Sequence, residues 1–190
     1  MKQSKWDPFR YEGLTAKQSF MGAAFLFVIA GISGWIYEEL FYRLNDGYFS
    51  WRGHGMGPWL PIYAFGMVIL LFLTAPVVKS KLKVIFLCAA VSGGFEYLVG
   101  WALYRFFGGL RLWDYNVERW NWGNIGGFVC IRSVLVFAVA APILIYTLVP
   151  LIGKMARSLS RRAYAFITMI PFGLFLIDII SGYLIKGFWK

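Results

Sequence analysis

Five long apolar stretches, separated by short polar segments, constrain most strongly what this chain can fold into. An α-helix needs about 20 apolar residues to cross the hydrocarbon core of a bilayer. The stretches are too long for strands and show no sustained alternation of apolar and polar residues. We therefore expect an all-α fold, a polytopic membrane helix bundle forming a single domain over residues 1–190. The five expected transmembrane helices cover roughly residues 20–41, 59–78, 84–107, 128–152 and 163–185.

The composition supports a membrane location. Hydrophobic residues make up 59% of the chain and charged residues only 15%, whereas a soluble domain carries about 25% charged residues. A water-soluble monomer with this composition would expose large apolar patches. The polar N-terminal segment lacks the apolar core and cleavage site of a signal peptide, so we expect the first helix to be retained.

The basic residues predict the orientation of the bundle. Short loops rich in Lys and Arg stay on the cytoplasmic side of a membrane. We therefore expect a cytoplasmic N-terminus, with the connections 42–58 and 108–127 outside, in a bacterial plasma membrane. These loops explain the net charge of +10, so we expect no nucleic-acid partner. The cytoplasmic clusters are Lys2, Lys5, Arg10, Lys17, Lys79, Lys81, Lys83, Lys154, Arg157, Arg161 and Arg162.

The acidic residues are concentrated toward the other side. In this topology all but Asp7 and Glu12 lie near the middle of the membrane or toward its outer face. Ionisable residues inside a membrane usually face the bundle interior and mark a site or pathway. We therefore expect a polar site that opens outward. The acids in question are Glu38, Glu39, Asp46, Glu96, Asp114, Glu118 and Asp178.

Small residues share a helix face with two of these acids. Gly93 and Gly100 lie three and four residues from Glu96, and Gly34 lies four residues before Glu38. Such spacing places them on one face, where small residues let a second helix approach closely. The pattern predicts that both carboxylates point into a shared interior. The alternative, for Glu96 and Asp178, is a polar contact that only fixes the order of the helices.

The first outer connection is predicted to be an irregular loop that dips toward the membrane. Gly53, Gly55 and Gly57 alternate with other residues ahead of two prolines, so a continuous helix is implausible here. Arg52 carries a fork-shaped donor suited to carboxylate or phosphate. His54 is the only histidine, so no site with paired histidines exists. We include His54 as a candidate for proton transfer, although a lone loop histidine is more often structural.

The second outer connection contributes Trp113, Asp114 and Tyr115, an acid between two aromatic residues that we expect to close the pocket. We expect Arg52 and Arg132 to offset the charges of Glu38 and Glu96.

No Walker A sequence, nucleophile elbow or zinc-protease motif occurs in the chain. We expect no metal site and no cofactor.

The ordered motifs resemble a known family. They read Gly34-Trp35-x-x-Glu38, Arg52-Gly53, Gly57-Pro58-x-x-Pro61-Ile62-Tyr63-x-x-Gly66, Glu96-Tyr97-x-x-Gly100-Trp101 and Trp113-Asp114-Tyr115. Over roughly residues 20–150 the chain is similar to the CmpB-type family named putative ABC-transporter type IV. The resemblance implies a small permease-like membrane protein, and it implies functional positions at Glu38, Arg52, Tyr63, Glu96, Trp113, Asp114 and Tyr115. To these we add His54, Tyr97 and Arg132.

Three functions remain open from the sequence. The first is a transporter or transporter subunit for a small molecule or lipid, working as a homo-oligomer or with a separate ATPase subunit. The second is a membrane-embedded enzyme that acts on a lipid or lipid-linked substrate in the outer leaflet. The third is a binding or assembly subunit whose polar core holds a membrane lipid or a partner helix. A continuous polar path through the bundle would favour the first, and a pocket open sideways to lipid the second.

Overall fold

The part of the chain that the structure describes folds into five α-helices, as the apolar stretches predict. The computed structural model describes residues 4–49, 51–53 and 55–185. Within these, four helices are long and apolar enough to cross a membrane. The helices are α1 (Ala16–Asp46), α2 (Pro61–Thr74), α3 (Lys81–Phe106), α4 (Ile131–Ser158) and α5 (Arg161–Ile179), with short helical turns at Arg10–Glu12, Ala75–Val77 and Ile180–Ile185.

The second predicted span is shorter than expected. Trp59 and Leu60 are not helical, and α2 begins only at Pro61, where Leu60 is extended (φ −120°, ψ 119°). Proline disfavours helical geometry in the residue before it and suits the first helical turn. With its terminal 3₁₀ turn, the helix spans Pro61–Val77. At 1.5 Å per residue this is about 25 Å, slightly less than the hydrocarbon core.

The ends of the helices follow ordinary capping chemistry. Thr15 caps α1 in a capping box with Gln18, and the Gly47 N–H donates to the Arg43 carbonyl at the other end. The side chain of Ser160 accepts a hydrogen bond of 3.2 Å from the Ala163 N–H at the start of α5. These caps satisfy backbone groups that a helix end leaves without partners. Helices α1 and α5 therefore start or stop where the sequence provides a cap.

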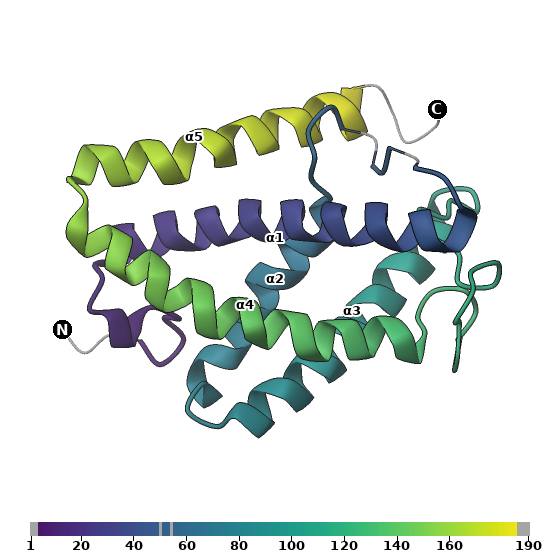
Figure 1. Ribbon diagram of the computed structural model, residues 1–190, viewed down its shortest axis with the longest axis horizontal. Helices are drawn as coiled ribbons and strands as arrows, with labels where there is room; N and C mark the ends of the chain where they lie inside the picture. The colour runs from purple at the N-terminus through teal and green to yellow at the C-terminus, as the bar shows by residue number, and fades with distance from the viewer. Residues whose placement is uncertain (1–3, 50, 54, 186–190) are drawn as a thin grey trace.

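Helix α1 is the central element of the bundle. It packs against α2, α5 and α4, while α3 packs mainly on α4 and α2. Figure 1 shows α1 and α5 side by side along the long axis, with α2 and α3 inclined to them. The N-terminal segment and the α4–α5 turn lie at one end of the molecule, and the two long connections lie at the other.

The two ends of the bundle differ in character. The main core, at the N-terminal end of α1, includes fully buried Phe9, Leu26, Ile152 and Tyr164. Large apolar side chains also cover the outside of the bundle, as lipid-facing positions require. Examples are Phe86, Leu98, Val139, Phe166 and Ile177, each at least 60% exposed. Three buried carboxylates belong to the long connections or contact them: Glu118 lies in the second connection, Glu96 binds Tyr115 of the same connection, and Asp178 binds the first connection at Met56.

Candidate functional site

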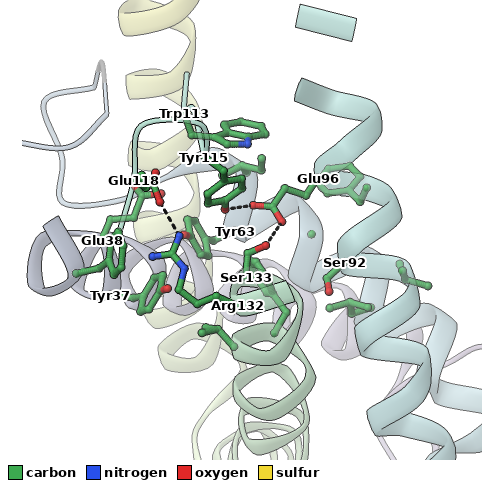
Figure 2. A pocket seen from close by; sticks show the side chains of 18 of the residues that line it. Tyr37, Glu38, Tyr63, Ser92, Glu96, Trp113, Tyr115, Glu118, Arg132 and Ser133 are labelled. Carbon is green, nitrogen blue, oxygen red and sulfur yellow. Dashed lines mark hydrogen bonds and ion pairs between the residues drawn. The ribbon is translucent and has the colours of Figure 1, made fainter. Parts of the chain in front are cut away.

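A chamber of about 50 Å³ lies where α1 ends and α4 begins. All four helices α1 to α4 and the connection between α3 and α4 contribute to its wall. Figure 2 shows its polar side chains converging from these elements. The polar and aromatic residues that line it are Tyr37, Glu38, Tyr42, Tyr63, Ser92, Glu96, Trp113, Tyr115, Glu118, Arg132 and Ser133.

Glu96, the single acid of α3, is buried, with 7% of its surface exposed. The Tyr115 hydroxyl donates a hydrogen bond to one carboxylate oxygen, and Ser133 Oγ donates to the other over 2.7 Å (Figure 2). Burial and the neighbouring Glu96 carboxylate raise the pKa of Tyr115, so this hydroxyl stays protonated and remains a donor. Among the residues that the structure describes, no Arg or Lys forms an ion pair with Glu96.

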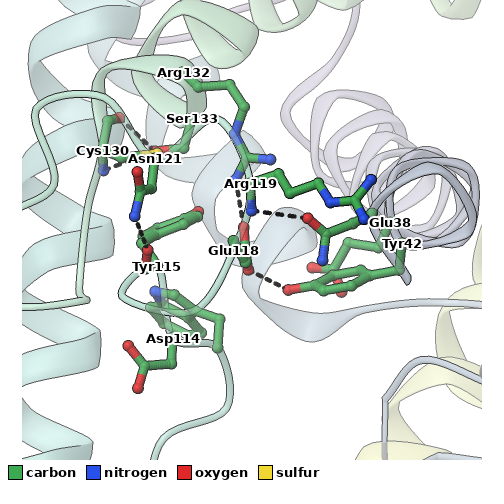
Figure 3. Close-up of polar contacts among 12 residues, drawn as sticks. Glu38, Tyr42, Asp114, Tyr115, Glu118, Arg119, Asn121, Cys130, Arg132 and Ser133 are labelled. Atoms are coloured by element: carbon green, nitrogen blue, oxygen red, sulfur yellow. Dashed lines mark hydrogen bonds and ion pairs between the residues drawn. The ribbon is translucent and has the colours of Figure 1, made fainter. Parts of the chain in front are cut away.

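Arg132 pairs with Glu118 and not with Glu96, which differs from our expectation. Its Nη2 lies 2.6 Å from Glu118 Oε2, and the Tyr42 hydroxyl donates to the other oxygen (Figure 3). Successive residues of a helix point about 100° apart. Ser133 therefore faces Glu96, while Arg132 reaches toward α1 and stacks on the Phe41 ring, 3.9 Å from its centroid.

The ion pair with Glu118 uses only one of the three nitrogens of the Arg132 guanidinium. Nε and Nη1 are buried and have no hydrogen-bond partner among the residues that the structure describes. Buried donors are nearly always satisfied by protein, water or ligand. Arg132 therefore offers unused donor capacity to the chamber that it lines.

Arg52 pairs with Glu38, as expected from the sequence. Its Nε lies 3.0 Å from Glu38 Oε2, and its backbone N–H donates to Glu39 over 2.8 Å. The guanidinium also stacks on Tyr42, 3.9 Å from the ring centroid. Burial acts to lower the pKa of Arg52, but Glu38, Tyr42 and Glu118 together outweigh it, and the net change in pKa is upward. Arg52 is thus held as a cation at the edge of the chamber.

The three residues Trp113, Asp114 and Tyr115 have different roles. Trp113 and Tyr115 line the chamber, and Trp113 is anchored by its indole N–H, which donates to the Phe128 carbonyl over 2.9 Å. Asp114 does not line it. It accepts from Arg111 Nη1 at 3.3 Å and from the Asn116 N–H at 3.0 Å, which shapes the connection. The two aromatic residues cover the chamber and the acid holds their loop.

The remaining predicted site residues are distributed differently. Tyr63 lines the chamber and packs closely against Gly34 of α1. Tyr97 does not line the chamber; its ring packs edge to face with the Phe128 ring, with centroids 5.8 Å apart. It borders an apolar groove between α3 and α4. His54 lies outside the described residues.

Three residues outside the predicted site also line the chamber. Glu118 and Tyr42 join Arg132 in one network, and Ser133 holds Glu96. The sequence offered a hint of Ser133, because it directly follows Arg132 at the start of an apolar helix. Glu118 was expected only as one of the acids toward the outer face, because it sits in an irregular connection rich in aromatic residues that resembles an interfacial belt.

A larger groove opens beside the chamber. It has a volume of about 790 Å³ and runs between α2 and α3 under the Leu110–Trp113 segment. Its wall is mainly apolar, and Arg52 and Arg111 lie at its polar end. Five residues line both spaces, so the groove adjoins the chamber directly. They are Glu38, Ile62, Ile69, Phe95 and Trp113.

Apolar side chains fill the bundle on the other side of the chamber. A space of about 100 Å³, smaller than the groove but larger than the chamber, continues between α1, α2 and α4 and is lined by Met67, Leu70 and Leu144 among others. Beyond it lies the main core, in which Leu71 and Ile145 are buried. The chamber therefore opens toward the groove and faces an apolar wall in the direction of the N-terminal end.

Comparison with known proteins identifies the family. A family model described as "Putative ABC-transporter type IV" matches residues 25–183. The match extends beyond the motifs of the first four helices and includes all of α5, with Asp178. No curated protein and no solved structure matches the chain. With a family match over most of its length and four apolar candidate spans, the chain is a membrane protein that belongs to this ABC-transporter type IV family.

Proposed function

We propose that this protein is the substrate-binding membrane subunit of a transport system, and that its substrate is an amphiphile taken from the bilayer. The observation that carries the proposal is the apolar groove of about 790 Å³ that adjoins the polar chamber. The groove suits a hydrocarbon tail, and the Glu38, Glu96 and Arg132 side chains suit a polar head. Pockets of this kind combine apolar walls with a few placed polar groups.

The proposed topology places the chamber in the outer leaflet. The end of the bundle opposite the chamber carries the N-terminal segment and the basic residues of the α2–α3 and α4–α5 turns, such as Lys81 and Arg161. Such clusters favour the cytoplasm. The substrate would then enter sideways from the outer leaflet. Because the sequence lacks a Walker A motif, a separate ATPase subunit or a second copy of the chain would complete the transport machinery.

One observation favours a second candidate, an enzyme that acts on an outer-leaflet lipid. The apolar core closes the chamber toward the N-terminal end, so the described residues form no continuous polar path through the bundle. Glu96, with hydroxyl partners on both oxygens, is suited to moving a proton. Release of a chemically altered amphiphile by the wild type, lost in Glu96→Gln, would favour this candidate over transport.

The test compares two substitutions on neighbouring residues of α3. Val99 lines the groove, whereas Leu98 is 61% exposed on the lipid side. Val99→Trp should fill the groove and reduce the co-purified amphiphile at least fivefold, measured by native mass spectrometry of gently extracted protein. Leu98→Trp should bind as the wild type does. Arg52→Ala and Glu96→Gln should also lose the ligand from the polar end.

The proposal requires that folded wild-type protein bind an amphiphile. Folded wild-type protein that carries no amphiphile above the level of bulk lipid would contradict it. Equal loss in Val99→Trp and Leu98→Trp would do the same, because the groove would then have no special role. Thermal unfolding of each variant shows whether a lost ligand reflects binding or folding.

A further inference from the structure

The charges of the chamber do not balance. Three carboxylates, those of Glu38, Glu96 and Glu118, line it. The two arginines beside them are each committed, Arg52 to Glu38 and Arg132 to Glu118. Glu96 is left with hydroxyl donors from Tyr115 and Ser133 and with no ion pair among the described residues. A buried carboxylate without a cation is costly unless a proton or a bound cation neutralises it.

Aromatic side chains share the chamber with Glu96. Tyr37, Tyr63, Trp113 and Tyr115 line the same chamber. The negative faces of such rings attract a cation within about 6 Å. Carboxylate oxygens have further lone pairs that accept hydrogen bonds from an ammonium N–H. The surroundings of Glu96 therefore suit a positively charged amine.

Arg132 supplies the complementary feature. Its Nε and Nη1 are buried donors with no partner among the described residues. They call for an oxygen acceptor, either from water or from a ligand. A guanidinium presents its donors as a planar fork that suits phosphate and other oxygen groups. The chamber thus provides an acceptor for a cation and unused donors for an oxygen.

The size of the chamber restricts the amine. About 50 Å³ holds only on the order of four water-sized groups, since one water needs roughly 10–15 Å³. A primary ammonium fits this space better than a bulky trimethylammonium group. A primary ammonium also has three N–H donors, whereas a quaternary one has none.

Resting on the proposed function, we propose that the substrate is an amphiphile with an ethanolamine-type head. Its primary ammonium binds at Glu96, and a neighbouring phosphate or ester oxygen accepts from Arg132. Its hydrocarbon chains occupy the groove between α2 and α3. The same chamber selects against anionic heads, because Glu96 then keeps no counter-charge.

The test offers three short-chain phospholipids with identical acyl chains and different heads to the purified protein. The heads are ethanolamine, choline and glycerol, and binding is measured by native mass spectrometry in competition. We expect the ethanolamine lipid to bind at least tenfold more tightly than the other two. Glu96→Gln should abolish this preference, and Arg132→Lys, which keeps the charge beside Glu118, should weaken binding of the ethanolamine lipid.

The matched control is Glu12→Gln, which removes an acid at the opposite end of the bundle where Glu12 pairs with Arg157. It should leave the preference unchanged. Saturable binding of all three lipids with equal affinity would overturn the inference and leave the proposed function standing. A preference for the glycerol head would also overturn it. If none of the lipids binds to folded wild-type protein, the proposed function fails as well.

Discussion

Two buried carboxylates at the same end of the bundle have different partners. Asp178 of α5 is 6% exposed and Glu96 of α3 is 7% exposed. Asp178 accepts from the backbone N–H groups of Met56 and Gly57, at 2.8 and 3.1 Å, and from the Trp59 indole at 2.6 Å. Glu96 accepts from two hydroxyls and faces a cavity. Burial of an acid therefore does not by itself mark a site; its partners and the adjoining space do.

Asp178 holds the first long connection against the bundle. Trp59 stacks on Phe175, with ring centroids 4.8 Å apart, and the Leu60 N–H donates to the Gly31 carbonyl of α1 over 3.0 Å. The connection carries Arg52, which reaches Glu38. Asp178 thus acts on the chamber indirectly, by fixing the loop that delivers Arg52.

The largest effect should come from Asp178→Ala. It leaves the Met56 and Gly57 N–H groups and the Trp59 indole without their acceptor. A buried donor left unsatisfied costs about 1–3 kcal/mol. We expect the free energy of unfolding to fall by about 3 kcal/mol or more, measured by denaturant unfolding in detergent micelles. Binding should weaken too, because Arg52 would lose its fixed position.

The control for this prediction is Asp46→Ala, which removes an exposed acid at the end of α1. Surface substitutions of this kind change stability by about 0.5 kcal/mol at most. If Asp178→Ala lowered stability as little as Asp46→Ala does, Asp178 would not hold the loop. The conclusion that Asp178 is a structural acid, in contrast to Glu96, would then be wrong.

A smaller effect should follow from Gly34→Ala on α1. A Cβ at this position would collide with the Tyr63 side chain, which forms part of the chamber wall. Overpacking of this kind costs about 1–3 kcal/mol. We expect that loss of stability together with weaker ligand binding, because Tyr63 must move into the chamber. Thermal unfolding and native mass spectrometry measure the two effects.

Gly94→Ala is the matched control, because a Cβ at Gly94 of α3 meets nothing within 4 Å. Alanine favours a helix over glycine by up to about 1 kcal/mol. The control should therefore be neutral or slightly stabilising. Equal behaviour of the two variants would mean that close approach of α1 to Tyr63 does not shape the chamber.

The sequence predicted the helices better than the contacts of the connections. Long apolar stretches predicted the helices, and small residues on one face predicted that Glu38 and Glu96 converge. The pairing of Arg52 with Glu38 was also correct. The pairing of Arg132 with Glu118 was not predicted, because the partner lies in an irregular connection without periodicity. The same reason explains why Asp114 was expected over the chamber, while it actually holds its own loop.

The smallest effect on stability should come from Glu96→Gln. The amide keeps the size of the carboxylate and an oxygen that accepts from Tyr115, and the Ser133 hydroxyl can rotate to accept from the new N–H group. Replacing a charged group that has no ion pair removes a desolvation cost. We expect the free energy of unfolding to change by less than about 1 kcal/mol, or to rise, while ligand binding is lost. A loss of stability comparable to that of Asp178→Ala would show that both acids hold the bundle together, and Glu96 would then be a structural residue.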